Sequence, residues 1–164
     1  MPQPKGYSTI QIVLHWTIAA LVVFQLFVNE AMQHAFSDRL DSGRIDQTGG
    51  ALLHISVGIT ILALAAIRLA IRARRGAPAP YEGTPAILNW LGHATHVLLY
   101  GFIFFMPLTG AIAWFFGIEF SAELHEIGRL VLVPAIGFHV IGAFAEHFVF
   151  RNDTLKRMLR ATAD

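Results

Sequence analysis

The stretch LHEIGRLVLVPAIGFHVIGAFAEHFVF, residues 124–150, is apolar over a length that can cross a bilayer, yet it contains His125 and His139. A helix needs about 20 mainly apolar residues to span the hydrocarbon layer. An ionisable side chain at that depth is costly unless it has a partner, and imidazole is a favoured metal ligand. The stretch therefore predicts a membrane span in which each of the two histidines has a partner, such as a metal ion.

The rest of the chain has the composition of a membrane bundle. Of its 164 residues, 55% are hydrophobic and only 14% are charged, against about 25% charged in soluble domains. We expect an all-α fold, a four-helix transmembrane bundle forming one domain over residues 1–164. The predicted spans cover about 9–28, 51–71, 91–116 and 124–150.

The segments between the spans carry helix signals and helix breakers. The first span opens with a capping-box pattern at Ser8–Gln11, and it is too long for a typical signal peptide, so we expect it to remain. A polar segment, 29–50, follows it. The Pro-rich linker at 76–86 breaks any helix, and the tail after residue 150 is expected to be a short polar helix or a frayed end.

The basic residues predict the orientation, because loops rich in Lys and Arg stay in the cytoplasm. Nine of the twelve fall on the side of the termini and the linker, and three on the other side. We therefore expect both termini to be cytoplasmic, in a bacterial inner membrane. The nine are Lys5, Arg68, Arg72, Arg74, Arg75, Arg151, Lys156, Arg157 and Arg160; the three are Arg39, Arg44 and Arg129.

Net charge and cysteine content exclude several classes of function. The net charge of +1 gives no indication of nucleic-acid binding. Cysteine is absent, which excludes disulfides, iron–sulfur ligation, thiolate-ligated haem and covalent haem attachment. Any metal must therefore be held mainly by nitrogen or oxygen, and the eight histidines are the plentiful candidates.

Topology assigns a membrane depth to four of these histidines. His54 and His125 each lie near the outer start of a span, and His15 lies in the cytoplasmic half of the first span. His139 follows His125 by 14 residues, about 21 Å along a helix and about 40° short of four full turns, so the two share a face. The spacing predicts an outer pair, His54 with His125, and an inner pair, His15 with His139.

Two imidazoles from facing helices suit a haem better than other metals. Zinc sites usually need three or four protein ligands, whereas a porphyrin supplies four nitrogens and leaves two axial positions. We therefore predict two haem b groups. The alternative is that the histidines join helices through hydrogen bonds. Small residues near them would suit either a porphyrin or close helix packing: Gly58, Gly128, Gly137 and Gly142.

The remaining histidines have weaker patterns. His93 and His96 form an i, i+3 pair at the cytoplasmic start of the third span. They could replace His15 as a ligand or line a quinone or proton site, but we favour an interfacial polar pair. We expect His147 to be interfacial and His34 to be solvated in the outer loop.

Two arginines lie within apolar runs and need partners. Arg68 could grip a haem propionate, since guanidinium binds carboxylates bidentately, although we favour a role in marking the end of the span by snorkelling. Arg129, one turn after His125, could pair with a propionate or with Glu126.

Several stretches together resemble the bacterial cytochrome b561 family: YSTIQIVLHW, LHISVGITILALAAIRL, LGHATHVLLYGFIFFMPLTG, LHEIG and GFHVIGAFAEHFVFRNDTLKRML. The resemblance covers nearly the whole chain in order. It implies a four-helix inner-membrane protein with two b-type haems, and it implies axial ligands at His15, His54, His125 and His139. The paired histidines His93 and His96 are not axial ligands in the members that this chain resembles.

The family includes a superoxide oxidase that passes electrons to ubiquinone, so the resemblance makes superoxide:ubiquinone oxidoreduction one candidate. The predicted outer segments are acidic, however, which slows the approach of an anion. They carry Glu30, Asp38, Asp41, Asp46, Glu119, Glu123 and Glu126 against three arginines.

We therefore predict transmembrane electron transfer linked to the quinone pool, with the outer donor left open and no catalytic residue assigned. One alternative is an electron-delivery subunit for a separate periplasmic redox protein. Another is a haem-free membrane protein such as a transporter.

Overall fold

The computed structural model describes residue 4 and residues 6–42, 49–81 and 83–161. These residues form helices joined by short connections, without a β-strand among them. Four of the helices are long and apolar enough to cross a membrane, which confirms the predicted all-α, four-span fold. The helices are α1 (Thr9–Phe27), α2 (Asn29–Ser42), α3 (Gly49–Arg75), α4 (Ala86–Phe116), α5 (Glu119–Phe148) and α6 (Thr154–Arg157).

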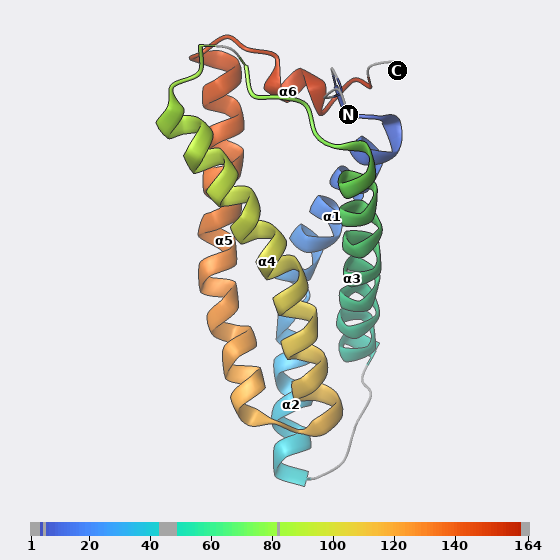
Figure 1. Cartoon of the computed structure of the whole chain (residues 1–164). Coiled ribbons are helices and arrows are strands. Elements are labelled where there is room, and N and C mark those ends of the chain that lie inside the picture. The colour runs from blue at the N-terminus through green and yellow to red at the C-terminus, as the bar shows by residue number, and fades with distance from the viewer. Residues whose placement is uncertain (1–3, 5, 43–48, 82, 162–164) are drawn as a thin grey trace.

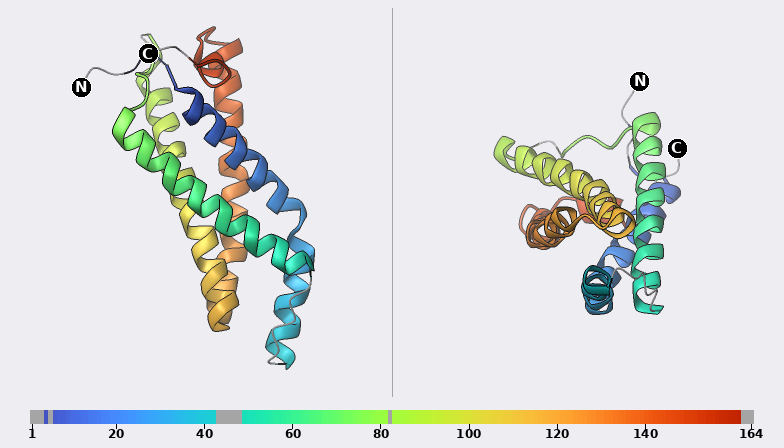
Figure 2. Two further views of the ribbon diagram at one scale, coloured as in Figure 1. Left: turned by 90° about the vertical axis from the view of Figure 1, so that its right-hand side faces the viewer. Right: turned by 90° about the horizontal axis from the view of Figure 1, so that it is seen from below.

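The bundle has two distinct ends. The end that carries the start of α1, the end of α3, the 76–85 linker and α6 is called the terminal end (Figure 1). The opposite end, formed by α2 and by the tight connection between α4 and α5, is called the hairpin end. Along the bundle α4 packs mainly with α5, and α1 packs with α3, as both views of Figure 2 show.

Local signals explain several helix boundaries. The predicted capping box at the start of α1 is present, with the Ser8 N–H donating to Gln11 Oε1 at 3.0 Å. Helix α4 ends at Gly117, whose φ of 68° is left-handed and favours glycine. Only Gly117 and Ile118 separate α4 from α5. Helix α5 therefore begins at Glu119, five residues before the predicted start of the fourth span.

The polar segment after the first span is the main departure from the predicted fold. Fourteen of its residues form α2 instead of an irregular connection. Ala35 of α2 is buried against Trp114 of α4, and Arg39 lies over the same indole with its guanidinium carbon 5.6 Å from the ring centre. Helix α2 therefore packs against α3 and α4 at the hairpin end. Lys5, Arg44 and Asp46, which entered the charge argument, lie outside the described residues.

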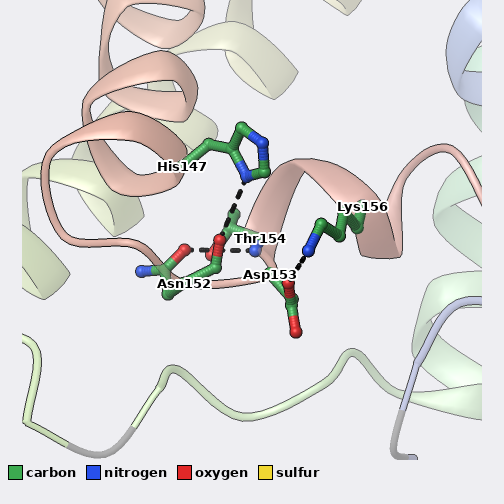
Figure 3. Close-up of polar contacts among 5 residues, drawn as sticks. All are labelled: His147, Asn152, Asp153, Thr154 and Lys156. Atoms are coloured by element: carbon green, nitrogen blue, oxygen red, sulfur yellow. Dashed lines mark hydrogen bonds and ion pairs between the residues drawn. The ribbon is translucent and has the colours of Figure 1, made fainter.

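The C-terminal tail turns aside at the end of α5 and is held there by polar contacts (Figure 3). The His147 Nδ1–H donates to the Asn152 carbonyl at 3.2 Å, and Asn152 Oδ1 accepts from the Thr154 N–H at 3.1 Å. Lys156 pairs with Asp153 at 2.8 Å, and its ammonium hydrogen bond lowers the pKa of that carboxyl below its ordinary 3.8. The short polar helix expected in the tail is α6.

The tail is also attached to the rest of the terminal end. The Trp16 indole N–H donates to the Met158 carbonyl at 2.8 Å. Arg157 donates to the Ala79 carbonyl at 2.9 Å and lies over the Tyr81 ring, 3.9 Å from its centre. These contacts join α1, the linker and the tail into one layer across the terminal end.

Candidate metal centres

Helices α3 and α5 bring together the histidine pair predicted near the hairpin end. The ring centres of His54 and His125 lie 6.1 Å apart, and the ring planes are inclined by 70°. Both side chains are partly buried. We call this pair the hairpin-end site.

Helices α1 and α5 bring together the second predicted pair. The ring centres of His15 and His139 also lie 6.1 Å apart, with ring planes inclined by 67°. Helix α5 contributes one histidine to each pair, and 14 residues of helix correspond to a separation of about 21 Å. We call the pair His15–His139 the terminal-end site.

The distance within each pair suits two imidazoles on one metal ion. An imidazole nitrogen binds a metal at about 2.0 Å and lies about 1.1 Å from its own ring centre, so two imidazoles on opposite sides of a metal have centres about 6.2 Å apart. Both observed separations are 6.1 Å. Within the described residues, no three or more His, Asp or Glu side chains converge as a metal site. Two nitrogens per site suit an iron whose other ligands come from a porphyrin.

The surroundings of His125 leave its second nitrogen free for a metal. Its Nδ1–H donates to the Met106 carbonyl at 2.8 Å, because a carbonyl can only accept, and Thr109 Oγ1 lies 3.3 Å from the same nitrogen. A hydrogen bond of this kind fixes the tautomer and the ring orientation of a metal-bound histidine. Gly110 allows the close approach, since a Cβ there would lie 3.1 Å from the His125 ring.

His54 is supported from α1 by a residue that the sequence pattern did not single out. The Gln25 side-chain N–H donates to the His54 backbone carbonyl at 2.8 Å. Gln25 Oε1 and His54 Nδ1 are both buried and have no hydrogen-bond partner among the described residues. A side-chain amide near the end of the apolar first span, at Gln25, was the available signal for this contact.

The structure separates the predicted pair on the third span. His96 lies beside the terminal-end site, with its ring centre 5.0 Å from that of His139 and its Nδ1–H donating to the Gly92 carbonyl at 2.6 Å. His93 is exposed. His96 therefore faces the terminal-end site while His93 does not, and the interfacial position favoured for the pair stays a prediction.

The two arginines of interest also point to specific partners. Arg68 donates from Nη1 to the Gln11 carbonyl at 2.7 Å, near the start of α1, and its expected role in marking the end of the span stays a prediction. Arg129 is half-buried and lies within electrostatic range of His125. Glu126, its predicted partner, instead accepts a hydrogen bond from Gln33 Nε2 at 3.2 Å.

The four glycines play different parts. A Cβ at Gly128 would lie 2.6 Å from Met106 Sδ, so this glycine permits close packing of α5 on α4. At Gly58 the nearest atom would be Gln25 Nε2, at an ordinary 3.5 Å. At Gly137 and Gly142, which flank His139, no described atom lies within 4 Å. Close packing therefore explains only Gly128.

The last two histidines stand away from both sites. His34 is exposed, as expected, but it lies on α2 and not in a loop. His147 lies at the end of α5 and bonds to the tail, and its expected interfacial position stays a prediction.

Comparison with known proteins identifies the family of this chain. The profile of a family described as prokaryotic cytochrome b561 matches residues 6–161. A cytochrome b562 of Cereibacter sphaeroides is 30% identical over 161 residues, covering 98% of this chain and 99% of the relative. A probable superoxide oxidase, CybB, of Yersinia pestis is 26% identical, covering 94% of this chain and 96% of the relative.

The matches span all four membrane helices and the histidines on them, so the predicted resemblance is confirmed. These matches support haem-based electron transfer in a membrane as the activity of the protein. The chain belongs to the prokaryotic cytochrome b561 family.

Proposed function

We propose that this protein holds two b-type haems, one at the hairpin-end site and one at the terminal-end site. His54 and His125 would hold the first haem, and His15 and His139 would hold the second. The observation that carries the proposal is the pair of equal ring separations, 6.1 Å each, on helices that share α5. A haem bound at each site would supply a one-electron carrier.

The residues around the sites favour electron transfer over chemistry on oxygen. With two histidines to hold it at each site, a bound haem would supply one-electron transfer. The Met106 carbonyl holds the His125 ring in one orientation, and Gln25 ties α1 to α3 beside His54. The chain thereby fixes its candidate ligands on rigid helices, as a carrier that must not rearrange requires.

The charge pattern supports an orientation with the terminal end in the cytoplasm. Arg74, Arg75 and Arg151 are exposed at that end, and basic residues are retained on the cytoplasmic side. In a bacterial inner membrane, the hairpin-end site would then lie near the periplasm, about 21 Å of helix from the terminal-end site.

Quinone is the proposed mobile partner in the membrane. One relative is named a probable superoxide oxidase, which makes superoxide a candidate donor. Six exposed carboxylates at the hairpin end, here called the acidic rim, would slow the approach of an anion. The acidic rim consists of Glu30, Asp38, Asp41, Glu119, Glu123 and Glu126.

The same acidic rim favours a second candidate function, electron delivery to or from a separate periplasmic redox protein. A cationic protein partner would be steered towards these carboxylates. Spectra of the purified protein recorded with superoxide, and then with a ubiquinone analogue, distinguish the two functions. Rapid reduction by superoxide followed by oxidation by the quinone supports the first candidate, whereas no reaction with either reagent supports the second.

Redox-titrated absorption spectra of single-site variants test the haem assignment. His54→Ala and His125→Ala should each abolish one haem component, and His15→Ala and His139→Ala should each abolish the other. His34→Ala, which removes an exposed histidine on α2, is the matched control and should retain both. Equal loss of both components in all four site variants would contradict the pairing.

A further inference from the structure

Two buried polar atoms beside the hairpin-end site have no hydrogen-bond partner among the described residues. They are Nδ1 of His54, on α3, and Oε1 of Gln25, on the neighbouring helix α1. Buried polar groups are almost always hydrogen-bonded, because leaving one unpaired costs about 1–3 kcal/mol. Two unpaired atoms on residues that already touch each other therefore point to a bond between them.

The existing contact between the two residues determines which way the Gln25 amide faces. Its Nε2 donates to the His54 backbone carbonyl at 2.8 Å. A carbonyl can only accept, so the amide nitrogen, and not the oxygen, must face it. The nitrogen and oxygen of one amide lie about 2.3 Å apart, which places Oε1 within about 5 Å of the same carbonyl oxygen. The unpaired acceptor thus lies close to the residue that carries the unpaired ring nitrogen.

The surface of α3 accommodates the amide at this level. Gly58 lies one turn after His54 on α3. A Cβ at Gly58 would lie 3.5 Å from Gln25 Nε2. The amide therefore lies over the single turn of α3 between His54 and Gly58, and both Gln25 and His54 are partly buried there.

The two unpaired atoms are chemically complementary when His54 acts as a metal ligand. A histidine that binds a metal through Nε2 carries its proton on Nδ1, and that N–H usually donates to an acceptor nearby. His125, the other histidine of the site, donates in this way to the Met106 carbonyl at 2.8 Å. His54 needs an equivalent acceptor, and the amide oxygen of Gln25 is an unpaired one of the required kind.

We propose that the Gln25 amide oxygen accepts the Nδ1–H of His54, either directly or through one bridging water. Gln25 is then a positioning residue, which acts on the hairpin-end site through His54. It fixes the tautomer and the orientation of the His54 ring from α1, as the Met106 carbonyl does for His125 from α4. The role of His54 as a ligand rests on the function proposed above, but the contact itself requires no haem.

NMR spectroscopy of the haem-free full chain in nanodiscs, labelled with ¹⁵N at histidine, tests the contact without a cofactor. Protonated and unprotonated imidazole nitrogens have well-separated ¹⁵N shifts, and the His54 signals are those missing from His54→Asn. We expect wild-type His54 to carry its proton on Nδ1. Gln25→Met, a neutral change of similar length, should lower the ratio of the Nδ1–H to the Nε2–H tautomer by about fivefold, the equivalent of one hydrogen bond.

Gln33→Met is the matched control, because it removes an exposed amide at the same end of the bundle that donates to Glu126. It should leave the His54 tautomer unchanged. A wild-type His54 with Nδ1 unprotonated would overturn the proposal, and this spectrum decides even if Gln25→Met does not fold. A tautomer ratio that is the same in folded Gln25→Met and in Gln33→Met would overturn it as well.

Haem titration of the same proteins shows whether the contact controls the site. Losing an outer partner of a metal-bound histidine costs about 10–100-fold in affinity. Gln25→Met should therefore weaken binding of the hairpin-end haem component by at least about tenfold and leave the terminal-end component unchanged. Equal weakening of both components would contradict a role that acts through His54.

The two proposals fail in different ways. If the tautomer depends on Gln25 but His54→Ala retains both haem components, the contact stands and the haem assignment fails. If His54→Ala loses one component but the tautomer does not depend on Gln25, the haem assignment stands and the positioning role of Gln25 fails.

Discussion

Replacing Gly110 by Ala should weaken the hairpin-end site while leaving the terminal-end site intact. The new Cβ would lie 3.1 Å from the His125 ring, about 0.3 Å or more inside an ordinary van der Waals contact. The ring cannot simply move away, since its Nδ1–H is bonded to the Met106 carbonyl at 2.8 Å. Either that bond lengthens or the ring tilts.

The expected loss of haem affinity can be judged from the known effect of disturbing a hydrogen bond to a metal-bound histidine. Losing an outer contact of a metal-bound histidine typically costs about 10–100-fold in affinity, which equals about 1.4–2.8 kcal/mol. We therefore expect Gly110→Ala to lower haem affinity at the hairpin-end site by this factor. The loss should be local, because Gly110 lies about 21 Å of helix from the level of the other site.

The assay is haem titration of the purified apoprotein in nanodiscs, followed by a redox titration of the absorbance. Gly101→Ala is the control, since it lies nine residues earlier on the same helix and a Cβ there meets nothing within 4 Å. Equal weakening of both haem components by Gly110→Ala would refute the reasoning. Equal effects of Gly110→Ala and Gly101→Ala would refute it too.

Four further outcomes are expected. Gln25→Leu removes a buried hydrogen bond to the His54 carbonyl and should destabilise the bundle by about 1 kcal/mol in thermal unfolding, whereas Gln33→Leu on the exposed α2 surface should not. Gly128→Ala introduces the 2.6 Å contact with Met106 and should cost about 1–3 kcal/mol of unfolding free energy. Neutralising the acidic rim should slow electron exchange with a small basic cytochrome by about tenfold at low salt, with little change at high salt. In a redox titration, the component lost in His15→Ala should have the higher midpoint potential.

Much of the site could be predicted from the sequence because an α-helix converts spacing into position. His125 and His139 belong to one helix, so their 14-residue separation determines both their relative depth and their shared face. The charge pattern then placed His54 and His15 at matching depths. The structure brings both pairs to 6.1 Å, although whether they bind haem stays a prediction.

Features that depend on packing between helices could not be predicted in this way. His96 faces His139 because α4 packs closely on α5, and no spacing within one span contains that information. Helix α2 could not be predicted from the length of an apolar stretch, because its residues are mostly polar. Its apolar residues Met32, Ala35, Phe36 and Leu40 recur at helical spacing, and Met32 and Phe36 pack against the buried cluster around Ala35.

The two sites differ in their electrostatic surroundings, and the difference suggests a direction for electron flow. At the terminal-end site, the positive charge of Arg68 acts on both histidines. At the hairpin-end site, the charges of Glu126 and Arg129 oppose each other near His125. Net positive charge favours the reduced state of a nearby metal. One unit charge at about 10 Å and an effective dielectric of about 20 is worth about 1.7 kcal/mol. This is about 70 mV for a one-electron couple, so electrons arriving at the acidic rim would move downhill towards the terminal end, where a membrane quinone could receive them.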